Sequence, residues 1–203
     1  LAPTVLDPSL HPLEPVLRST FWLTTHVLII TISYAAFFLA FALGDLLLFY
    51  YLRDEKKYQK QIQDGALSIY RCIQIGVVLL AAGVILGGIW ADYSWGRFWG
   101  WDPKETWALI SIMIYAFVIH ARLVPGLRGR WTFNVFALFA YASIMMTYFG
   151  VNFYLSGLHS YASGDAPATP TFVWYITIFA VILSAVAYFR YKKFYGKKKQ
   201  LKA

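Results

Sequence analysis

The sequence has little cysteine and few charged residues, and both shortages restrict what the protein can be. Cys72 is the one cysteine in 203 residues, which excludes an internal disulfide and a thiol pair for redox chemistry. Charged residues make up 14% of the chain, whereas soluble domains contain about 25%. Hydrophobic residues make up 59%. This composition excludes an ordinary soluble domain and indicates an integral membrane protein.

Acidic residues are scarce as well, since 10 of them stand against 18 basic residues and give a formal net charge of +8. A basic excess is also typical of nucleic-acid-binding proteins. Here, however, the basic residues lie between long apolar runs or in the C-terminal tail, as membrane topology signals do. We therefore expect the lipid bilayer, and no nucleic acid, as a partner.

What the chain does contain is long apolar runs, each close to the ~20 residues that a helix needs to cross a bilayer. They lack the strict alternation of apolar and polar residues that the strands of an outer-membrane barrel show. The sequence predicts an all-α fold, a polytopic membrane helical bundle with about five transmembrane helices. The predicted spans are 21–43, 67–91, 106–123, 133–154 and 172–189.

The distribution of Lys and Arg predicts the orientation of these spans. Fifteen of the 18 basic residues lie in segments 53–63 and 122–130, at Arg71, or between Arg190 and the C-terminus. The positive-inside rule therefore places the C-terminus in the cytoplasm. The predicted domains are an extracytoplasmic leader (1–20), a transmembrane domain (21–190) with an outer Trp-rich loop (95–107), and a basic cytoplasmic tail (191–203).

Tryptophan is concentrated in that predicted outer loop. Five of the eight tryptophans fall between Trp90 and Trp107, with Gly and Asp among them. An aromatic belt at the membrane interface accounts for one or two of them at a helix end. It does not require four within 95–107, so we favour a platform for a flat, amphiphilic ligand. The belt is the alternative.

The predicted topology also sorts the histidines. His26 lies near the outer end of the first span and His159 just past the outer end of the fourth, so both flank the Trp-rich loop. Two imidazoles on one membrane face can fill both axial positions of a haem iron. Zinc is a weaker alternative, because no His, Cys and Glu cluster has the spacing of a closed zinc site.

His120 lies near the inner end of the third span, about 20 Å along the helix axis from Trp107. We expect it to be buried in the cytoplasmic half of the bundle and to support a separate, deeper haem position. An interfacial histidine, or one hydrogen-bonded within the bundle, is the alternative.

Four motifs in order resemble the System II cytochrome c synthases, which are Ccs-type haem-handling proteins. The matching region extends from about residue 8 to residue 162. The run that begins at Trp95 resembles the WWD motif of this family. The motifs are Trp22-Leu23-x-x-His26-Val27, Trp95-Gly96-x-x-Trp99-x-Trp101-Asp102-Pro103-Lys104-Glu105-Thr106-Trp107, Ile119-His120-Ala121-Arg122, and Tyr148-Phe149-Gly150-Val151-Asn152 leading to Gly157-Leu158-His159-Ser160-Tyr161.

The resemblance implies a holocytochrome c synthase, an enzyme of the haem lyase type. Such a protein holds haem b, its substrate and ligand, at the outer membrane face and attaches the vinyl groups to the Cys-x-x-Cys-His thiols of apocytochrome c. It also implies that His26 and His159 ligate the haem iron outside, and that His120 is one of two transmembrane histidines that take haem through the membrane. The catalytic set that it implies is His26, His159, Trp95, Trp99, Trp101 and Asp102.

The chemistry of this reaction gives further roles to the loop. Trp95, Trp99 and Trp101 are expected to pack on or around the porphyrin, and Arg97 is a candidate partner for a haem propionate. Asp102 followed by Pro103 predicts the N-cap and first residue of the third helix. An acid–base role for Asp102 is the alternative.

The resemblance also implies partners and a location. The partners are apocytochrome c and a preceding or associated Ccs subunit that carries the second transmembrane histidine, so we expect this chain to be the C-terminal membrane portion of a longer protein. The location is the bacterial inner membrane with the active face outside; a plastid thylakoid membrane is the alternative. Two other functions stay open: a haem transporter or chaperone without ligase activity, and a haem-binding membrane anchor of a respiratory complex.

Overall fold

The computed structural model describes residues 20–158 and 169–200, with side chains as far as Tyr191. Within these ranges the chain is helical apart from short connections, and five helices are long and apolar enough to cross a membrane. The predicted all-α membrane bundle is therefore confirmed. The helices are α1 (Thr20–Asp54), α2 (Gln59–Trp95), α3 (Pro103–Ala121), α4 (Arg130–Met145), which continues as the π-helix η1 (Met146–Tyr154), and α5 (Thr171–Gln200).

The first two helices are longer than the predicted spans. They contain 35 and 37 residues, or about 50 and 55 Å of helix, whereas the hydrocarbon core of a bilayer is about 30 Å thick. The segment 53–63, predicted as a loop from its charges, is mostly helical, because α1 ends at Asp54 and α2 begins at Gln59. The end of an apolar run marks the edge of the membrane and not the end of the helix.

Glycines along one side of α2 let α1 pack closely against it. A Cβ atom at Gly76 would lie 2.7 Å from the Phe37 ring, and one at Gly83 would lie 2.5 Å from Ile30. Small residues at a membrane helix interface allow this approach of the two backbones. The Phe37 ring also stacks on Tyr115 of α3, with 3.9 Å between the ring centroids, so the core joins three helices.

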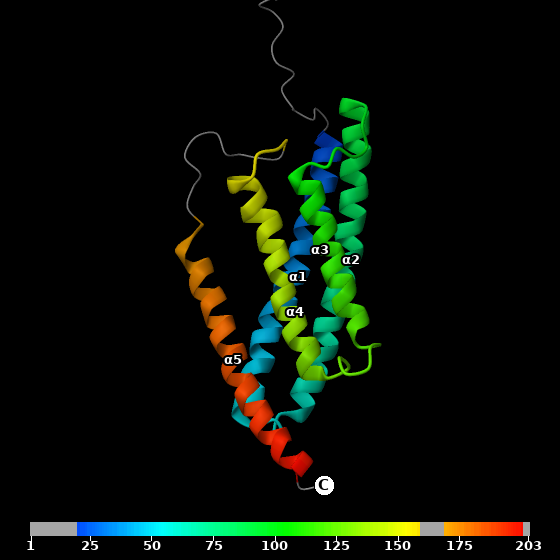
Figure 1. The fold of residues 1–203 in the computed structure, drawn as a ribbon. Helices are drawn as coiled ribbons and strands as arrows, with labels where there is room; N and C mark the ends of the chain where they lie inside the picture. Colours follow the sequence, from blue (N-terminus) through cyan, green and yellow to red (C-terminus); the bar gives the residue numbers. More distant parts are fainter. Residues whose placement is uncertain (1–19, 159–168, 201–203) are drawn as a thin grey trace, which may run out of the picture.

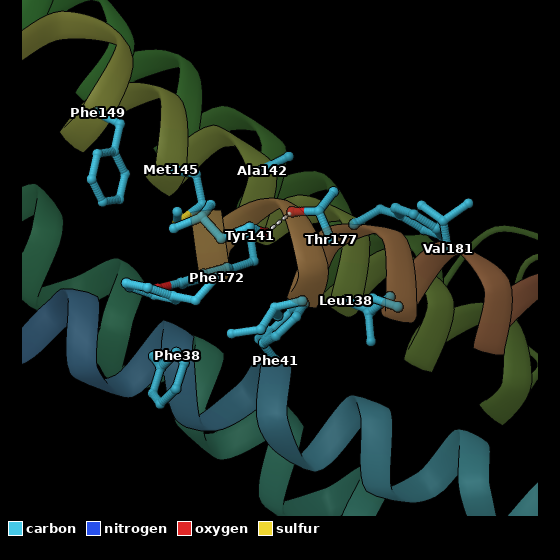
Figure 2. Close-up of a pocket in the computed structure, with 14 residues that line it drawn as sticks. Phe38, Phe41, Leu138, Tyr141, Ala142, Met145, Phe149, Phe172, Thr177 and Val181 are labelled. Atoms are coloured by element: carbon cyan, nitrogen blue, oxygen red, sulfur yellow. Dashed lines mark hydrogen bonds between the residues drawn. The ribbon is translucent and has the colours of Figure 1, made fainter. Parts of the chain in front are cut away.

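The fifth helix lies along one side of the others (Figure 1). Ala180 and Ala187 of α5 are buried against Leu48 of α1 and Leu138 of α4. Nearer the start of α5, an apolar groove of about 210 Å³ separates it from α1 and α4, and none of the described residues that line the groove is charged (Figure 2). Most other large side chains of α5 are exposed, as expected for a face that contacts lipid.

The chain reverses direction from helix to helix, which gives the bundle two distinct ends (Figure 1). The start of α1, the end of α2, the start of α3 and the end of η1 share one end, together with the connection 96–102. The connections 55–58 and 122–129 lie at the other end with the C-terminal end of α5. This alternation agrees with the predicted topology, whereas the side of the membrane that each end faces stays a prediction.

Candidate functional site

His26 lies in the second turn of α1, at the same end of the bundle as the Trp-rich connection (Figure 1). Its Nδ1 atom is 2.8 Å from the carbonyl oxygen of Gly83 on α2. A carbonyl only accepts, so Nδ1 carries the proton and the ring lone pair belongs to Nε2. A hydrogen bond of this kind fixes the tautomer and the orientation of metal-ligating histidines. The ring fits beside α2 because residue 87 is glycine; a Cβ there would lie 2.7 Å from Cε1 of His26.

A cavity of about 100 Å³ adjoins His26. Side chains of α1, α2, the Trp-rich connection and α3 surround it, so four segments of the chain meet here. Ligand pockets usually measure about 300–1,000 Å³, so the cavity has room for the edge of a porphyrin and not for a whole one. The lining residues used below are His26, Trp90, Trp95, Trp99, Lys104 and Glu105.

Two unusual backbone conformations shape the Trp-rich connection. Gly96 ends α2 with φ +67°, a left-handed conformation in which glycine commonly ends helices. Trp101 has φ +57°, a region that costs a residue with a Cβ about 1–2 kcal/mol. Its ring is 71% exposed and meets Trp99 edge-on, with 5.8 Å between the centroids. Trp99 therefore lines the cavity, while Trp101 faces outward beside it.

Glu105 fixes this connection from the first turn of α3. Its Oε2 atom accepts hydrogen bonds from the backbone N–H groups of Gly100 (2.8 Å) and Asp102 (3.1 Å). The second bond is half of a capping box, in which the Asp102 side chain in turn accepts from the backbone of the first turn. The predicted N-cap at Asp102 and Pro103 is thus confirmed.

Asp102 has a second partner, from a distant part of the chain. Its Oδ2 atom accepts from the N–H of Lys104 at 3.0 Å, while Oδ1 accepts from the N–H of Leu158 at 2.6 Å. Gly157 lies so close that a Cβ there would be 2.6 Å from Oδ1. The carboxylate is 6% exposed. It therefore ties the start of α3 to the segment that follows η1. The acid–base role stays an untested alternative.

Lys104 makes a further connection to η1 that the sequence did not reveal. Its Nζ donates to the carbonyl oxygen of Thr147 at 3.0 Å and to Oδ1 of Asn152 at 2.9 Å. The sequence placed Lys104 only in the first turn of α3. A signal was present, since Asn152 is a polar residue in an apolar span and such residues usually face the bundle interior and find partners there.

The remaining candidate residues are distributed as follows. The Arg97 guanidinium is exposed, packs on Gly100 and lies 5.9 Å from the Trp95 ring. His120 lies at the other end of the bundle, with Nδ1 2.7 Å from the carbonyl oxygen of Ala116. His159 and His11 lie outside the described residues.

The expected burial of His120 is wrong, because its side chain is exposed on the outer surface of α3. Among the residues that the structure describes, no three His, Cys, Asp or Glu side chains converge to hold a metal ion. Haem iron needs only one or two axial side chains from the protein, so a single oriented histidine such as His26 is compatible with haem.

Comparison with known proteins identifies the family of this chain. The sequence profile of the cytochrome C assembly protein family matches residues 3–159. The chain belongs to this family. The match includes His26, the Trp-rich connection and His120, and it ends at His159. This cytochrome c assembly protein is therefore an integral membrane protein of cytochrome c biogenesis, and its resemblance to the Ccs-type proteins is confirmed.

Several members of the family are closely similar to it. Protein NrfI of Wolinella succinogenes is 48% identical over 163 residues, which are 79% of this chain and 18% of that protein. The cytochrome c biogenesis protein CcsA of Chlamydomonas reinhardtii is 37% identical over 74% of this chain and 43% of its own length. CcsA of Prochlorococcus marinus is 36% identical over 73% of this chain and 56% of its own length. The chain thus spans less than two thirds of these relatives.

Proposed function

We propose that this chain holds haem b at the Trp-rich end of the bundle while the haem is attached to apocytochrome c, as part of a holocytochrome c synthase. Family membership supports a role in cytochrome c assembly. The observation that carries the proposal is the setting of His26. The Gly83 carbonyl orients its ring, and the ring lines a cavity together with Trp95 and Trp99. The second axial ligand in this proposal is His159.

In the attachment reaction the enzyme mainly has to orient the haem and the peptide, and it needs to supply few reactive groups of its own. Each S–H group of the Cys-x-x-Cys-His segment adds across one vinyl C=C bond, so a C–S and a C–H bond form and nothing leaves. The substrate supplies both thiols, and Cys72 has no part in the reaction. His26 fixes the position of the iron, and the rings of Trp95 and Trp99 shape the space beside it. Holding reactants in register accounts for a large share of rate enhancement in such reactions.

Trp101, Arg97 and Asp102 have supporting roles in this proposal. Trp101 presents an exposed ring next to Trp99, where the outer part of the porphyrin or the peptide substrate would lie. Arg97 is a cation on the outward side of the loop and is available to a propionate. Asp102 holds the segment that ends at Leu158, one residue before His159.

His120 belongs to a second haem position in this proposal, at the entry side. Its ring is exposed on α3 at the opposite end of the bundle. An exposed histidine on a membrane helix suits a site completed by another helix, which the associated Ccs subunit would supply. The proposed location is a bacterial inner membrane with the Trp-rich end outside.

The test is maturation of a c-type cytochrome in cells that lack every other maturation system. We expect the complete protein to yield cytochrome with covalently bound haem, His26→Gly and His159→Gly to abolish the yield, and added imidazole to restore it in part by filling the vacated coordination position. Haem binding without any covalent product, even from the wild type, would support a haem transporter or chaperone instead. Full yield from both glycine variants without imidazole would contradict the proposal.

A further inference from the structure

Two buried indole N–H groups point to a further function of the cavity beside His26. The Nε1 atoms of Trp90 and Trp99 are buried and have no hydrogen-bond partner among the described residues. Trp90 is only 4% exposed, and both side chains line the cavity. A buried donor without an acceptor is costly, and native proteins rarely leave one unless a ligand or water completes it. The two indoles therefore indicate a ligand with acceptor atoms.

The charges around the cavity define the kind of acceptor. Lys104 lines it too, and its ammonium is held by two neutral oxygens, from Thr147 and Asn152. An ammonium has three donors, so one remains beyond these two bonds. Two carboxylates oppose this charge: Glu105, whose Oε2 atom already accepts two backbone N–H groups, and Asp102, whose oxygens already accept the N–H groups of Lys104 and Leu158. Two indole donors and a cation favour an anionic acceptor such as a carboxylate.

We propose that Trp90 and Trp99, assisted by the charge of Lys104, form a carboxylate subsite that takes a propionate of the porphyrin substrate. The proposal rests on the proposed function, because it assigns a polar role within the same haem site. Geometry supports it: the ring centroids of Trp90 and His26 are 6.2 Å apart, a separation within the span of one porphyrin. The subsite would set the rotation of the ring about the iron–His26 bond and so decide which edge faces the peptide thiols.

Trp131 provides a matched control inside the same chain. Its Nε1 is also buried without a partner among the described residues. It lies in the first turn of α4 at the opposite end of the bundle, where its ring stacks on Tyr191 with 5.3 Å between the centroids. It does not line the cavity beside His26. A buried indole N–H group without an acceptor is thus not enough to indicate the subsite. The proposal also requires that the indole lies beside His26 and Lys104, as Trp90 and Trp99 do.

The experiment compares two porphyrins that differ only in their carboxylates. The complete protein in detergent is titrated with haem and with haem dimethyl ester, and binding is followed by the absorption of the porphyrin. Trp90→Phe and Trp99→Phe keep an aromatic ring and remove the N–H donor. We expect the wild type to bind haem about tenfold more tightly than the ester, since the ester lacks the charge that strengthens these hydrogen bonds. Each Phe variant should lose most of this preference, because haem binding weakens more than ester binding, and Trp131→Phe should keep it.

Equal binding of haem and the ester by the wild type would contradict the carboxylate subsite but not the haem site itself. This comparison uses the wild type alone and so does not depend on the folding of any variant. Full preference for haem in both cavity variants would also overturn the subsite. Failure of the wild type to bind either porphyrin would overturn the proposed function together with the subsite.

Discussion

At the scale of single residues, a non-glycine residue with an unusual backbone conformation lies in the Trp-rich connection. Trp101 adopts a left-handed backbone conformation that glycine accepts far more readily. Strain of this kind persists where the surroundings impose it and is common at ligand sites. The motif predicted the importance of this tryptophan, but the sequence carried no sign of its φ angle or of its exposure, because both depend on how α2 and α3 are joined.

Replacement of Trp101 separates the strain from the ring. Trp101→Gly removes a conformational cost of about 1–2 kcal/mol, so we expect a thermal unfolding midpoint equal to or above that of Trp101→Ala, which keeps the cost. Both variants lose the exposed ring and should retain less haem than the wild type. Thermal unfolding in detergent and the haem content after purification measure the two effects. Wild-type haem content in both variants would remove Trp101 from the platform.

Gly87 should control the position of the His26 ring. An alanine at this position would place a methyl group 2.7 Å from Cε1 of His26, which must shift the ring and alter the ligation of the iron. Gly76→Ala is the matched control, since its methyl group would meet Phe37 at the same distance in the core. We expect both variants to unfold at lower temperature and only Gly87→Ala to change the absorption spectrum of bound haem. Unchanged spectra in both would argue against His26 as a ligand.

At the scale of elements, the first turn of α3 organises the Trp-rich end of the bundle. Asp102 bonds to the segment after η1, and Lys104 bonds to η1 itself. Glu105 bonds to the Trp-rich connection. The local half of this arrangement was predictable, because Asp-Pro-x-Glu is the signature of a capped helix start. The long-range half was not, since local pattern does not reveal which distant backbone group meets a side chain. The π-helical turn of η1 escaped prediction for the same reason, because apolar periodicity indicated one uninterrupted helix.

Substitution of Asp102 tests this connection. In Asp102→Asn one carboxylate oxygen becomes an NH2 donor, so either the Lys104 or the Leu158 N–H group loses its acceptor. We expect unfolding to become easier by about 1–3 kcal/mol, the usual cost of an unsatisfied buried donor. Haem ligation by His159 should weaken as well, because the preceding segment is released. Glu105→Gln is the control, since an amide oxygen can still accept both of its backbone bonds.

For Asp102→Asn, the measurements are the unfolding of the protein in detergent and the absorption spectrum of bound haem. Wild-type stability and spectrum in Asp102→Asn would show that the bond to Leu158 does not position the outer site. Partial restoration of the spectrum by imidazole would show that the loss arises at a coordination position and not from general unfolding.

At the scale of the whole molecule, the helices place His26 and His120 at opposite ends of one bundle (Figure 1). This could be predicted by counting apolar spans, because each crossing reverses the direction of the chain. The sequence did not predict how far the helices extend beyond the bilayer. Nor did it show that His120 faces outward, since the face of a nearly uniformly apolar helix is set by its neighbours. The exposure of His120 suits a haem path completed by another subunit.

The orientation of the bundle is open to direct measurement. The basic residues concentrate at the end that carries the C-terminal part of α5, so the positive-inside rule places this end in the cytoplasm. We expect a reporter that is active only in the cytoplasm to be active when fused after Ala203. A reporter that is active only outside should be active when inserted in the Trp-rich connection. The reverse pattern would place the proposed haem site on the cytoplasmic face and contradict the outer location.

The central claim, that His26 ligates haem at the Trp-rich end, is tested most directly by the absorption spectrum of the purified complete protein with and without reductant. We expect the wild type to show six-coordinate haem with two histidine ligands. His26→Gly should change that spectrum or lose haem, and imidazole should restore the wild-type form. His120→Gly should lower the amount of haem while leaving the spectrum of what remains unchanged. A wild-type haem spectrum at full occupancy in His26→Gly, without imidazole, would contradict the account.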